Sequence, residues 1–239
     1  LTGHAGGVNS VALSPSGTQI ATASADYTGR IWDRKTGQVL TPLKGHTASV
    51  NSIAFSPDGK SLVTASADVT SRIWDAQTGR ILLTLRGHSA GVNSATFSPD
   101  GRKVATASDD RTVRLYDARS GRLILTLNGH GAAVNSVVFS ADGKHLLTAS
   151  ADQTAWLWDA ATGREQLTFK GHSAWVYSAT FSPDGTHVLT ASEDGTARIW
   201  DVRTGRELHS MTGHAAGILY ATYSPDGRQL VTTGLDGTA

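Results

Sequence analysis

The sequence contains no cysteine, only 6 prolines and a single methionine among its 239 residues. Without cysteine the chain can form no disulfide scaffold, no thiolate metal site and no cysteine nucleophile. It also lacks an excess of one charge, because 21 Lys and Arg balance 20 Asp and Glu to a net charge of +1. This balance is untypical of nucleic-acid-binding proteins, and the apolar runs of four or five residues are too short to span a membrane. We therefore expect a cytoplasmic protein with no nucleic-acid partner and no membrane partner.

What the sequence does contain is glycine, 26 residues of it, and a repeat. Gly-His dipeptides recur at intervals of 42 residues, an Asp follows each histidine 22 residues later, and an aromatic-Asp pair follows six residues after that Asp in the first five copies. A fixed period of this length indicates one structural unit copied along the chain. The repeats lie near residues 3–44, 45–86, 87–128, 129–170, 171–212 and 213–239, and the last is partial.

Each repeat predicts four short strands. In the second repeat these are residues 50–55, 62–66, 70–74 and 81–85, separated by turns that carry Gly, Pro or Asp. The connections are too short for parallel crossovers, so each repeat is an antiparallel meander. One meander cannot bury both of its faces alone, whereas stacked copies in a radial arrangement can. The sequence therefore predicts an all-β chain, a β-propeller of four-stranded blades that forms a single domain over residues 1–239.

The phased Gly-His, Asp and Trp-Asp positions resemble the WD-repeat family over essentially the whole chain. This resemblance implies a propeller with four antiparallel strands in each blade, used as a rigid platform for contacts with other proteins. It implies neither an enzyme nor a cofactor.

The repeated His, Asp and hydroxyl residues suggest chemistry, but the meander offers a structural explanation. Antiparallel order brings His46 and Asp68 to the same end of one blade, with Trp74 close by. A hydrogen-bond chain from the indole through a hydroxyl and the imidazole to the carboxylate would satisfy every buried polar group. The hydroxyl is that of Thr64 or Ser66, and the sequence leaves the choice open.

The structural tetrad of the WD-repeat family resembles this chain, and its copies in successive repeats indicate architecture rather than a catalytic or metal site. With the serine taken as the hydroxyl member, the tetrads are His46, Ser66, Asp68 and Trp74; His88, Ser108, Asp110 and Tyr116; His130, Ser150, Asp152 and Trp158; and His172, Ser192, Asp194 and Trp200.

Three departures from the repeat stand out. Tyr116 replaces the expected Trp, and its hydroxyl can still donate, so we expect the network of that repeat to survive. Trp156 replaces an Arg, and we expect it to pack between blades. Gly234 in the sixth repeat replaces the serine, and no Trp follows it.

Function should lie in positions that vary while the framework stays fixed. The residues around the framework Val after Gly-His are small or polar in most repeats, but the fifth repeat has Trp175 and Tyr177 there. Aromatic residues of this kind are favoured as binding hot spots. With their neighbours and the residues before the turn Asp, they predict a partner-binding top face made of Trp175, Tyr177, Leu219, Tyr220, Glu193, Asp109 and Leu235.

The sequence therefore predicts a non-catalytic scaffold that binds a peptide or protein on its top face, with no cofactor and no metal. The alternative is a purely structural segment of a larger propeller that has no ligand of its own. Self-association through the partial sixth blade is a further expectation, because an unfinished sheet leaves edges open to pairing.

Overall fold

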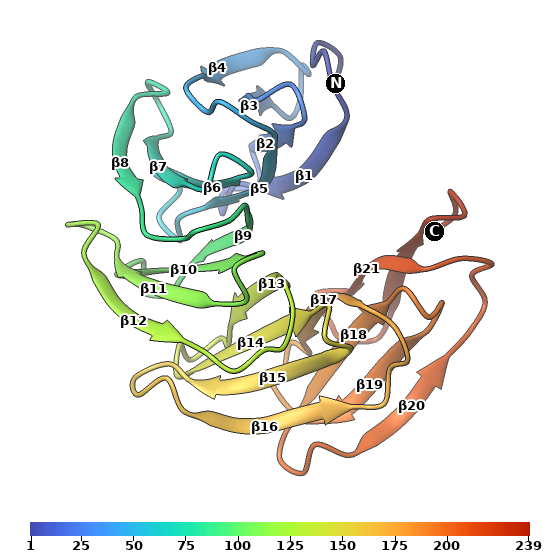
Figure 1. Cartoon of the computed structure of the whole chain (residues 1–239). Helices are drawn as coiled ribbons and strands as arrows, with labels where there is room; N and C mark the ends of the chain where they lie inside the picture. Colours follow the sequence, from blue (N-terminus) through green and yellow to red (C-terminus); the bar gives the residue numbers. More distant parts are fainter. The chain divides into compact units, whose positions relative to one another are not determined.

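The computed structural model describes all 239 residues as an all-β chain with five four-stranded antiparallel sheets and one two-stranded sheet. The predicted fold class is confirmed: each sheet is one repeat, and its strands pair in chain order (Figure 1). No element is a helix with the length and hydrophobicity needed to cross a membrane. The chain divides into two compact units, Leu1–Thr126 and Leu127–Ala239, which we describe separately.

We number the sheets as blades 1 to 6 in chain order, and the first unit holds blades 1 to 3. Their strands are β1 (Val8–Leu13), β2 (Gln19–Ser24), β3 (Gly29–Asp33) and β4 (Val39–Leu43); β5 (Val50–Phe55), β6 (Ser61–Ser66), β7 (Ser71–Asp75) and β8 (Ile81–Leu85); and β9 (Val92–Phe97), β10 (Lys103–Ser108), β11 (Val113–Asp117) and β12 (Leu123–Leu127).

The second unit holds blades 4 to 6, and blade 6 has two strands. The strands are β13 (Val134–Phe139), β14 (His145–Ser150), β15 (Thr154–Asp159) and β16 (Glu165–Lys170); β17 (Val176–Phe181), β18 (His187–Ser192), β19 (Ala197–Asp201) and β20 (Glu207–Met211); and β21 (Ile218–Tyr223) with β22 (Leu230–Gly234).

The strands of the second repeat lie where the sequence predicts them, with β6 beginning one residue earlier and β7 one residue later than expected. The turn between β5 and β6 needs its glycine, because Gly59 has a φ of +70°. A second left-handed position follows the tetrad Asp of each repeat. Val69 occupies it in blade 2 with a φ of +70°, whereas blades 5 and 6 have Gly195 and Gly237.

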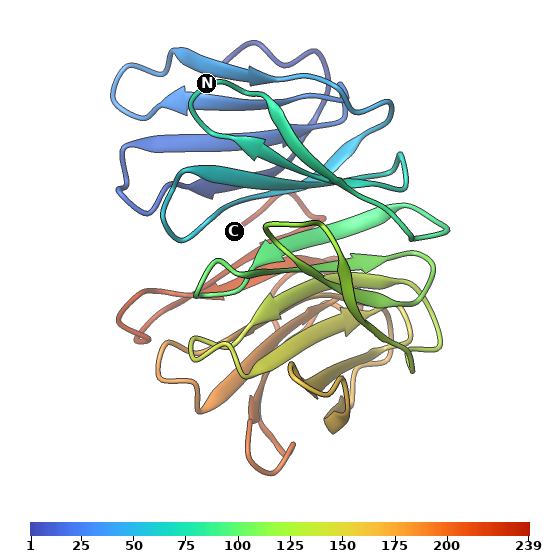
Figure 2. The same ribbon diagram turned by 90° about the vertical axis from the view of Figure 1, so that its left-hand side faces the viewer.

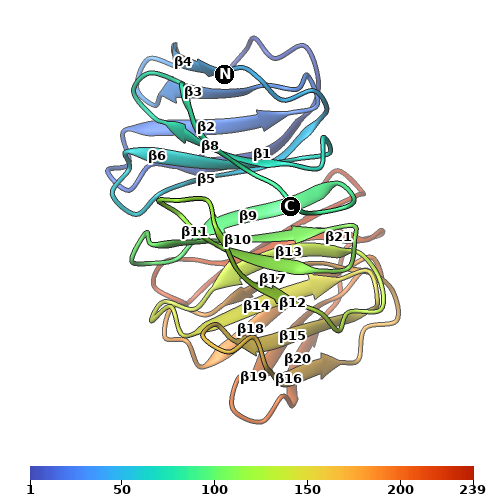
Figure 3. The ribbon, with the colours of Figure 1, turned by 60° about the vertical axis from the view of Figure 1, so that its left-hand side comes forward.

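Apolar side chains fill the space between successive blades within each unit. In the first unit, Trp74 of blade 2 is fully buried against Ala21, Ile31 and Leu43 of blade 1. In the second unit, Trp200 of blade 5 packs in the same way against blade 4. Figures 2 and 3 show sheets stacked face to face within each unit. Trp burial against the preceding blade is therefore a large apolar contribution to these two interfaces.

Polar side chains on the first strand of a blade also tie it to the blade that follows. The amide of Asn9 donates to the carbonyl of Val50 at 3.0 Å, and the amide of Asn51 donates to Val92 at the same distance. In the second unit Asn135 donates to Val176 at 2.9 Å. The asparagine of the repeat is therefore a clamp between blades, a role that the sequence analysis did not assign.

The serine that follows this asparagine provides a second tie. The hydroxyl of Ser52 accepts a hydrogen bond from the Ala95 amide at 3.1 Å, and Ser178 accepts one from Ala221 at 3.3 Å. Ser136 of blade 4 differs, because its hydroxyl is buried and has no hydrogen-bond partner. The same residue type thus stabilises one interface and leaves an unsatisfied polar atom in another.

This difference yields a matched pair of variants. Ser178→Ala removes a hydroxyl that accepts a hydrogen bond, so we expect it to lower the free energy of unfolding by about 1 kcal/mol. Ser136→Ala removes a buried hydroxyl without a partner, so we expect no loss or a small gain. Chemical denaturation of the two variants beside the parent chain measures both effects. Equal losses in the two variants would contradict the assignment of these ties.

Candidate functional site

The repeated polar residues form one continuous hydrogen-bond chain, seen most clearly in blade 2. The Trp74 Nε1–H donates to Thr64 Oγ1 at 2.8 Å, and Thr64 Oγ1 lies 2.7 Å from His46 Nε2. On the other side of the ring, His46 Nδ1 lies 2.7 Å from Asp68 Oδ2. The backbone amide of Thr47 donates to the same carboxylate oxygen at 3.1 Å.

The Thr64 hydroxyl fixes the direction of this chain. Its oxygen accepts the indole proton, so its own proton is available for His46 Nε2, and Nδ1–H then donates to Asp68. The serine chosen from the sequence was wrong as the hydroxyl member, because Ser66 instead donates to the Ala48 carbonyl and accepts the Asp68 amide. Thr64 faces the imidazole, whereas Ser66 shapes the turn that holds Asp68.

All six repeats place a threonine in this position beside the imidazole, with Nε2–Oγ1 distances from 2.7 to 2.9 Å. The equivalents of Ser66 behave in the same way, because the hydroxyl of each donates to a backbone carbonyl in the loop after Gly-His. They are Ser108, Ser150 and Ser192. The threonines are Thr22, Thr64, Thr106, Thr148, Thr190 and Thr232.

Burial and hydrogen bonding shift the titration of the pair in opposite ways. Burial lowers the pKa of the His46 imidazole, although the Asp68 carboxylate opposes this effect. Burial alone would raise the pKa of Asp68, but hydrogen bonds from Thr70 and His46 outweigh it and lower that pKa to about 2. The folded state thus favours neutral histidine beside ionised aspartate, which is the form that the Thr64 hydroxyl can bond to.

Blade 3 keeps only part of this chain. Its His88 Nε2 lies 2.7 Å from the Thr106 hydroxyl, but the Tyr116 hydroxyl donates to the backbone carbonyl of Arg86 at 3.1 Å. Burial raises the pKa of the Tyr116 phenol, while the Arg114 charge and hydrogen bonding to the Arg114 and Thr106 side chains oppose this rise. Tyr116 therefore keeps an interaction with Thr106 and gains a main-chain acceptor beside it.

Blade 6 has the polar chain without an aromatic member. His214 Nε2 lies 2.9 Å from Thr232 Oγ1, and Nδ1 lies 3.0 Å from Asp236 Oδ2. The Asp236 carboxylate also accepts the Ala215 amide at 2.8 Å. The local frame of the repeat therefore forms from the first two strands alone.

Trp175 and Tyr177 stand where most other repeats have small or polar residues, and they flank Val176 at the start of β17 in blade 5. Trp175 is 51% exposed, and its ring meets the Tyr177 ring edge to face with 6.3 Å between centroids. The Glu193 amide donates to the Trp175 carbonyl at 2.9 Å, which joins the two loops. Burial and the Glu193 charge raise the pKa of the Tyr177 phenol. Tyr177 therefore stays neutral beside an exposed carboxylate.

Blade 6 adds two exposed leucines to this end. A Cβ on Gly217 would lie only 2.9 Å from Glu193 Cα, so the loop before Leu219 contacts the Glu193 turn directly. The Leu235 amide donates to the Gly217 carbonyl at 2.8 Å. Leu219 is 41% and Leu235 57% exposed. We name Trp175, Tyr177, Glu193, Leu219 and Leu235 the rim cluster.

Two other residues predicted for this surface do not join the rim cluster. Ala221 packs against blade 5, and side chains alternate along a strand, so Tyr220 points away from that blade. Tyr220 is 53% exposed, and its place on the partner-binding face stays a prediction. Asp109 belongs to the first unit, where its carboxylate accepts the Asn93 amide at 2.7 Å. We describe the rim cluster without it.

Comparison with known families identifies the chain. A family model described as the IFT122 first beta-propeller matches residues 91–239. A second model, described as WD domain, G-beta repeat, matches residues 1–33 and 37–75. The chain belongs to the IFT122 first beta-propeller family of WD repeats. The predicted resemblance is therefore confirmed. No curated protein matches the chain.

Within this WD-repeat chain, Trp156 contacts its own blade. Its ring lies tilted against His130 with 4.5 Å between centroids and against Trp158 with 5.0 Å. Its indole N–H donates to Thr154 at 2.8 Å. A Cβ on Gly129 would lie 2.4 Å from the Trp156 ring, so the glycine of Gly-His is required beneath it. Trp156 therefore covers the tetrad of blade 4.

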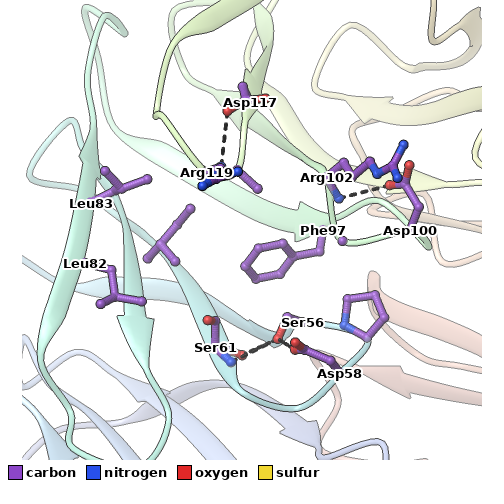
Figure 4. A pocket seen from close by; sticks show the side chains of 14 residues that line it. Ser56, Asp58, Ser61, Leu82, Leu83, Phe97, Asp100, Arg102, Asp117 and Arg119 are labelled. Carbon is purple, nitrogen blue, oxygen red and sulfur yellow. Dashed lines mark hydrogen bonds between the residues drawn. The ribbon is translucent and has the colours of Figure 1, made fainter.

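The first unit also contains a cavity of about 750 Å³ between blades 2 and 3, which sequence reasoning missed. Figure 4 shows the Phe97 ring directed into it, with Leu82 and Leu83 on one side and the turn of Asp58 on another. Between blades 1 and 2, Thr41 Oγ1 donates to the Gln77 carbonyl at 3.3 Å. Leu83 stands at the position of Thr41 one repeat later and cannot make that tie.

The polar residues that line this cavity belong to its turns. Asp58 accepts the Ser56 hydroxyl at 2.6 Å and the Lys60 amide at 3.0 Å. Asp117 likewise accepts the Ser120 hydroxyl and amide, each at 2.7 Å. These carboxylates therefore hold the local turns.

The first prediction from the tetrads concerns two equivalent carboxylates. Asp68→Ala leaves the buried Nδ1–H of His46 without an acceptor, so we expect a loss of about 1–3 kcal/mol in the free energy of unfolding. Asp236→Ala should cost less, because the pair in blade 6 is more exposed and has no Trp above it. Thermal or chemical denaturation compares the two. Equal losses would show that the complete hydrogen-bond chain of blade 2 does not make its His–Asp pair more stabilising than the pair in blade 6.

The second prediction concerns pH. His46, His88 and His172 have pKa values below the ordinary value because they are buried. As the pH falls below about 6.5, the unfolded chain binds protons that the folded chain does not, so stability falls. A second loss should follow below about pH 4, since the Asp68 pKa is about 2 in the folded state.

Melting temperatures measured from pH 8 to pH 3 at constant ionic strength check this expectation. A melting temperature that stays constant between pH 7 and pH 5 would contradict the role of the buried neutral histidines.

Proposed function

We propose that this chain is a non-catalytic WD-repeat scaffold whose rim cluster binds a peptide or protein segment. The main support is the exposure of Trp175, a large aromatic at a position where the preceding repeat has Ala133. Trp and Tyr dominate binding hot spots because they bury much area at a low cost in side-chain entropy. Membership of a WD-repeat propeller family agrees with protein partners in general.

The second support is that Tyr177 replaces a residue with a structural role. Its counterpart Asn135 clamps blade 4 to blade 5 through the Val176 carbonyl. A tyrosine cannot donate an amide N–H there, so blade 5 lacks this clamp to blade 6. A residue that replaces a stabilising contact without restoring it is better explained by binding than by packing.

The chemistry of the rim cluster indicates the kind of segment. Trp175, Leu219 and Leu235 offer exposed apolar surface, and Glu193 places an exposed carboxylate among them. We therefore expect an apolar anchor side chain with a Lys or Arg nearby. A cytoplasmic location is part of the proposal and is supported by the cysteine-free composition, which suits a reducing compartment.

The test is the double variant Trp175→Ala with Tyr177→Asn, which copies blade 4 at both positions. Peptides selected from a displayed library on the parent chain should bind this variant at least about tenfold more weakly, since hot-spot truncation costs 2 kcal/mol or more. The variant should fold as stably as the parent or slightly better, because Tyr177→Asn restores a clamp to the Ile218 carbonyl.

Leu208→Ser is the matched control, because Leu208 is 44% exposed on the outer strand β20, away from the rim cluster. It should leave peptide affinity unchanged. Selected peptides that bind parent and double variant equally, or a double variant that loses stability while affinity persists, would refute binding at the rim cluster.

A further inference from the structure

The cavity between blades 2 and 3 interrupts an interface that is otherwise closely packed. Elsewhere in this interface, apolar residues of the two blades form one buried cluster, to which Leu85 of blade 2 and Val92 and Val104 of blade 3 belong. The cavity of about 750 Å³ lies at the end of the blades that carries the β5–β6 and β9–β10 turns. It is therefore a local feature, and it lies wholly within the first unit.

The equivalent place between blades 1 and 2 is closed by a turn. A Cβ on Gly79, in the turn after β7, would lie 2.6 Å from a backbone carbonyl oxygen of β4. One repeat later, the nearest atom to a Cβ on Gly121 is a Leu85 methyl carbon at 3.5 Å. Ala118 in the same turn is half-buried, whereas its counterpart Ala76 is buried. The turn after β11 therefore lies farther from the outer strand of the preceding blade, and space remains between them.

The walls of the cavity are largely apolar and held in place. Ile73 and Phe97 belong to the buried cluster of the interface, and Leu83 packs against that cluster. Figure 4 shows the Phe97 ring facing Leu82 and Leu83 across the cavity. Leu82 is largely exposed, so an apolar molecule that enters removes its side chain from water. A cavity of this volume and lining has the size that small organic ligands occupy.

The charges of the lining have an excess of one sign. Three carboxylates line the cavity, those of Asp58, Asp100 and Asp117. A serine hydroxyl and a backbone amide hydrogen-bond each carboxylate and lower its pKa, so all three are ionised at neutral pH. The guanidinium groups of Arg102 and Arg119 also line the cavity. Three carboxylates against two guanidinium groups leave one net negative charge, which matches a ligand with a single positive charge.

Asp58 is the carboxylate best placed to receive that charge. The other two each have an arginine of the lining two residues later, whereas Lys60, two residues after Asp58, does not line the cavity. The Ser56 hydroxyl and the Lys60 amide both donate to Asp58 Oδ1, at 2.6 and 3.0 Å. These bonds orient the carboxylate and leave Oδ2 for a ligand. An ammonium group at Oδ2 would form a charge-assisted hydrogen bond with an acceptor that is already fixed.

We propose that this cavity binds a small amphiphilic amine, a ligand with an aliphatic body and one protonated primary amino group. The body packs between Leu82, Leu83 and Phe97, and the ammonium donates to Asp58 Oδ2. Binding is reversible and forms no covalent bond. The site shares no residue with the rim cluster and is independent of the function proposed for it.

The experiment uses the 239-residue chain and three probes with the same aliphatic body, namely n-octylamine, n-octanol and n-octanoate. Titrations at pH 7, followed by NMR of side-chain signals, should show saturable shifts at Leu82, Leu83 and Phe97. We expect n-octylamine to bind at least about threefold more tightly than n-octanol, because only the ammonium pairs with the Asp58 carboxylate. The carboxylate of n-octanoate meets the net negative charge of the lining, so this probe should bind most weakly.

Variants of the chain separate the charge from the apolar wall. Asp58→Asn keeps an oxygen acceptor for the donors of its turn but removes the charge. It should lower the affinity for n-octylamine to that for n-octanol and leave n-octanol binding unchanged. Leu82→Gln, which copies Gln166 of blade 4, should weaken binding of both probes by a similar factor.

Asp142→Asn is the matched control for the change at Asp58. Asp142 accepts the same two turn bonds in blade 4, from the Ser140 hydroxyl at 2.6 Å and the Lys144 amide at 3.0 Å, and it does not line the cavity. This variant should bind all three probes as the parent does. The Trp175→Ala, Tyr177→Asn variant should also bind n-octylamine unchanged, which separates this test from that of the rim cluster.

Four outcomes would each overturn the proposal. They are the absence of saturable shifts at Leu82, Leu83 and Phe97; n-octanoate binding as tightly as n-octylamine; and a preference for n-octylamine over n-octanol that persists in Asp58→Asn. The fourth is tighter binding of the dipeptide acetyl-Leu-Lys-amide than of n-octylamine, which would assign the cavity to a peptide segment instead of a small amine.

Discussion

The structure depends on one hydroxyl group that does two things at once. In blade 2 the Thr64 oxygen accepts the indole proton of Trp74 and offers its own proton to His46. A buried imidazole, a buried indole and a carboxylate are costly to remove from water unless each finds a partner. The threonine joins all three into one satisfied chain. It also ties the Gly-His loop, the second strand and the third strand of a blade together at one point.

This arrangement explains which substitutions the repeat tolerates. Tyr116 keeps the bulk of Trp, and its hydroxyl donates to the Arg86 carbonyl while it still interacts with the Thr106 side chain. Trp156 instead adds a ring over His130, where most repeats have Arg. The framework therefore varies at the aromatic position while the imidazole, hydroxyl and carboxylate keep their geometry.

Much of the fold could be predicted from the sequence, because a 42-residue period with strand-length segments permits little else. The choice between Thr64 and Ser66 could not, because both hydroxyls lie two residues apart on the same face of β6, and only their distance along the strand from the imidazole decides which one meets the ring. The Asn clamp had a visible signal, the same residue at one phase in four repeats. Its acceptor is a backbone carbonyl in the next repeat, however, and because every residue has a backbone carbonyl the sequence does not identify which one accepts. The cavity beside Phe97 lies between side chains of two neighbouring blades, and a sequence does not show how closely such side chains pack.

The clamps between blades join a side chain on one repeat to the main chain of the next. Asn51 and Ser52 supply specific groups, but the Val92 carbonyl and the Ala95 amide that meet them are groups that almost any residue has. A duplicated repeat would thus arrive with its own donors and acceptors and find suitable partners without compensating changes in its neighbour. Gene duplication can extend such a chain by whole repeats, and near-identical copies are the expected record of that process.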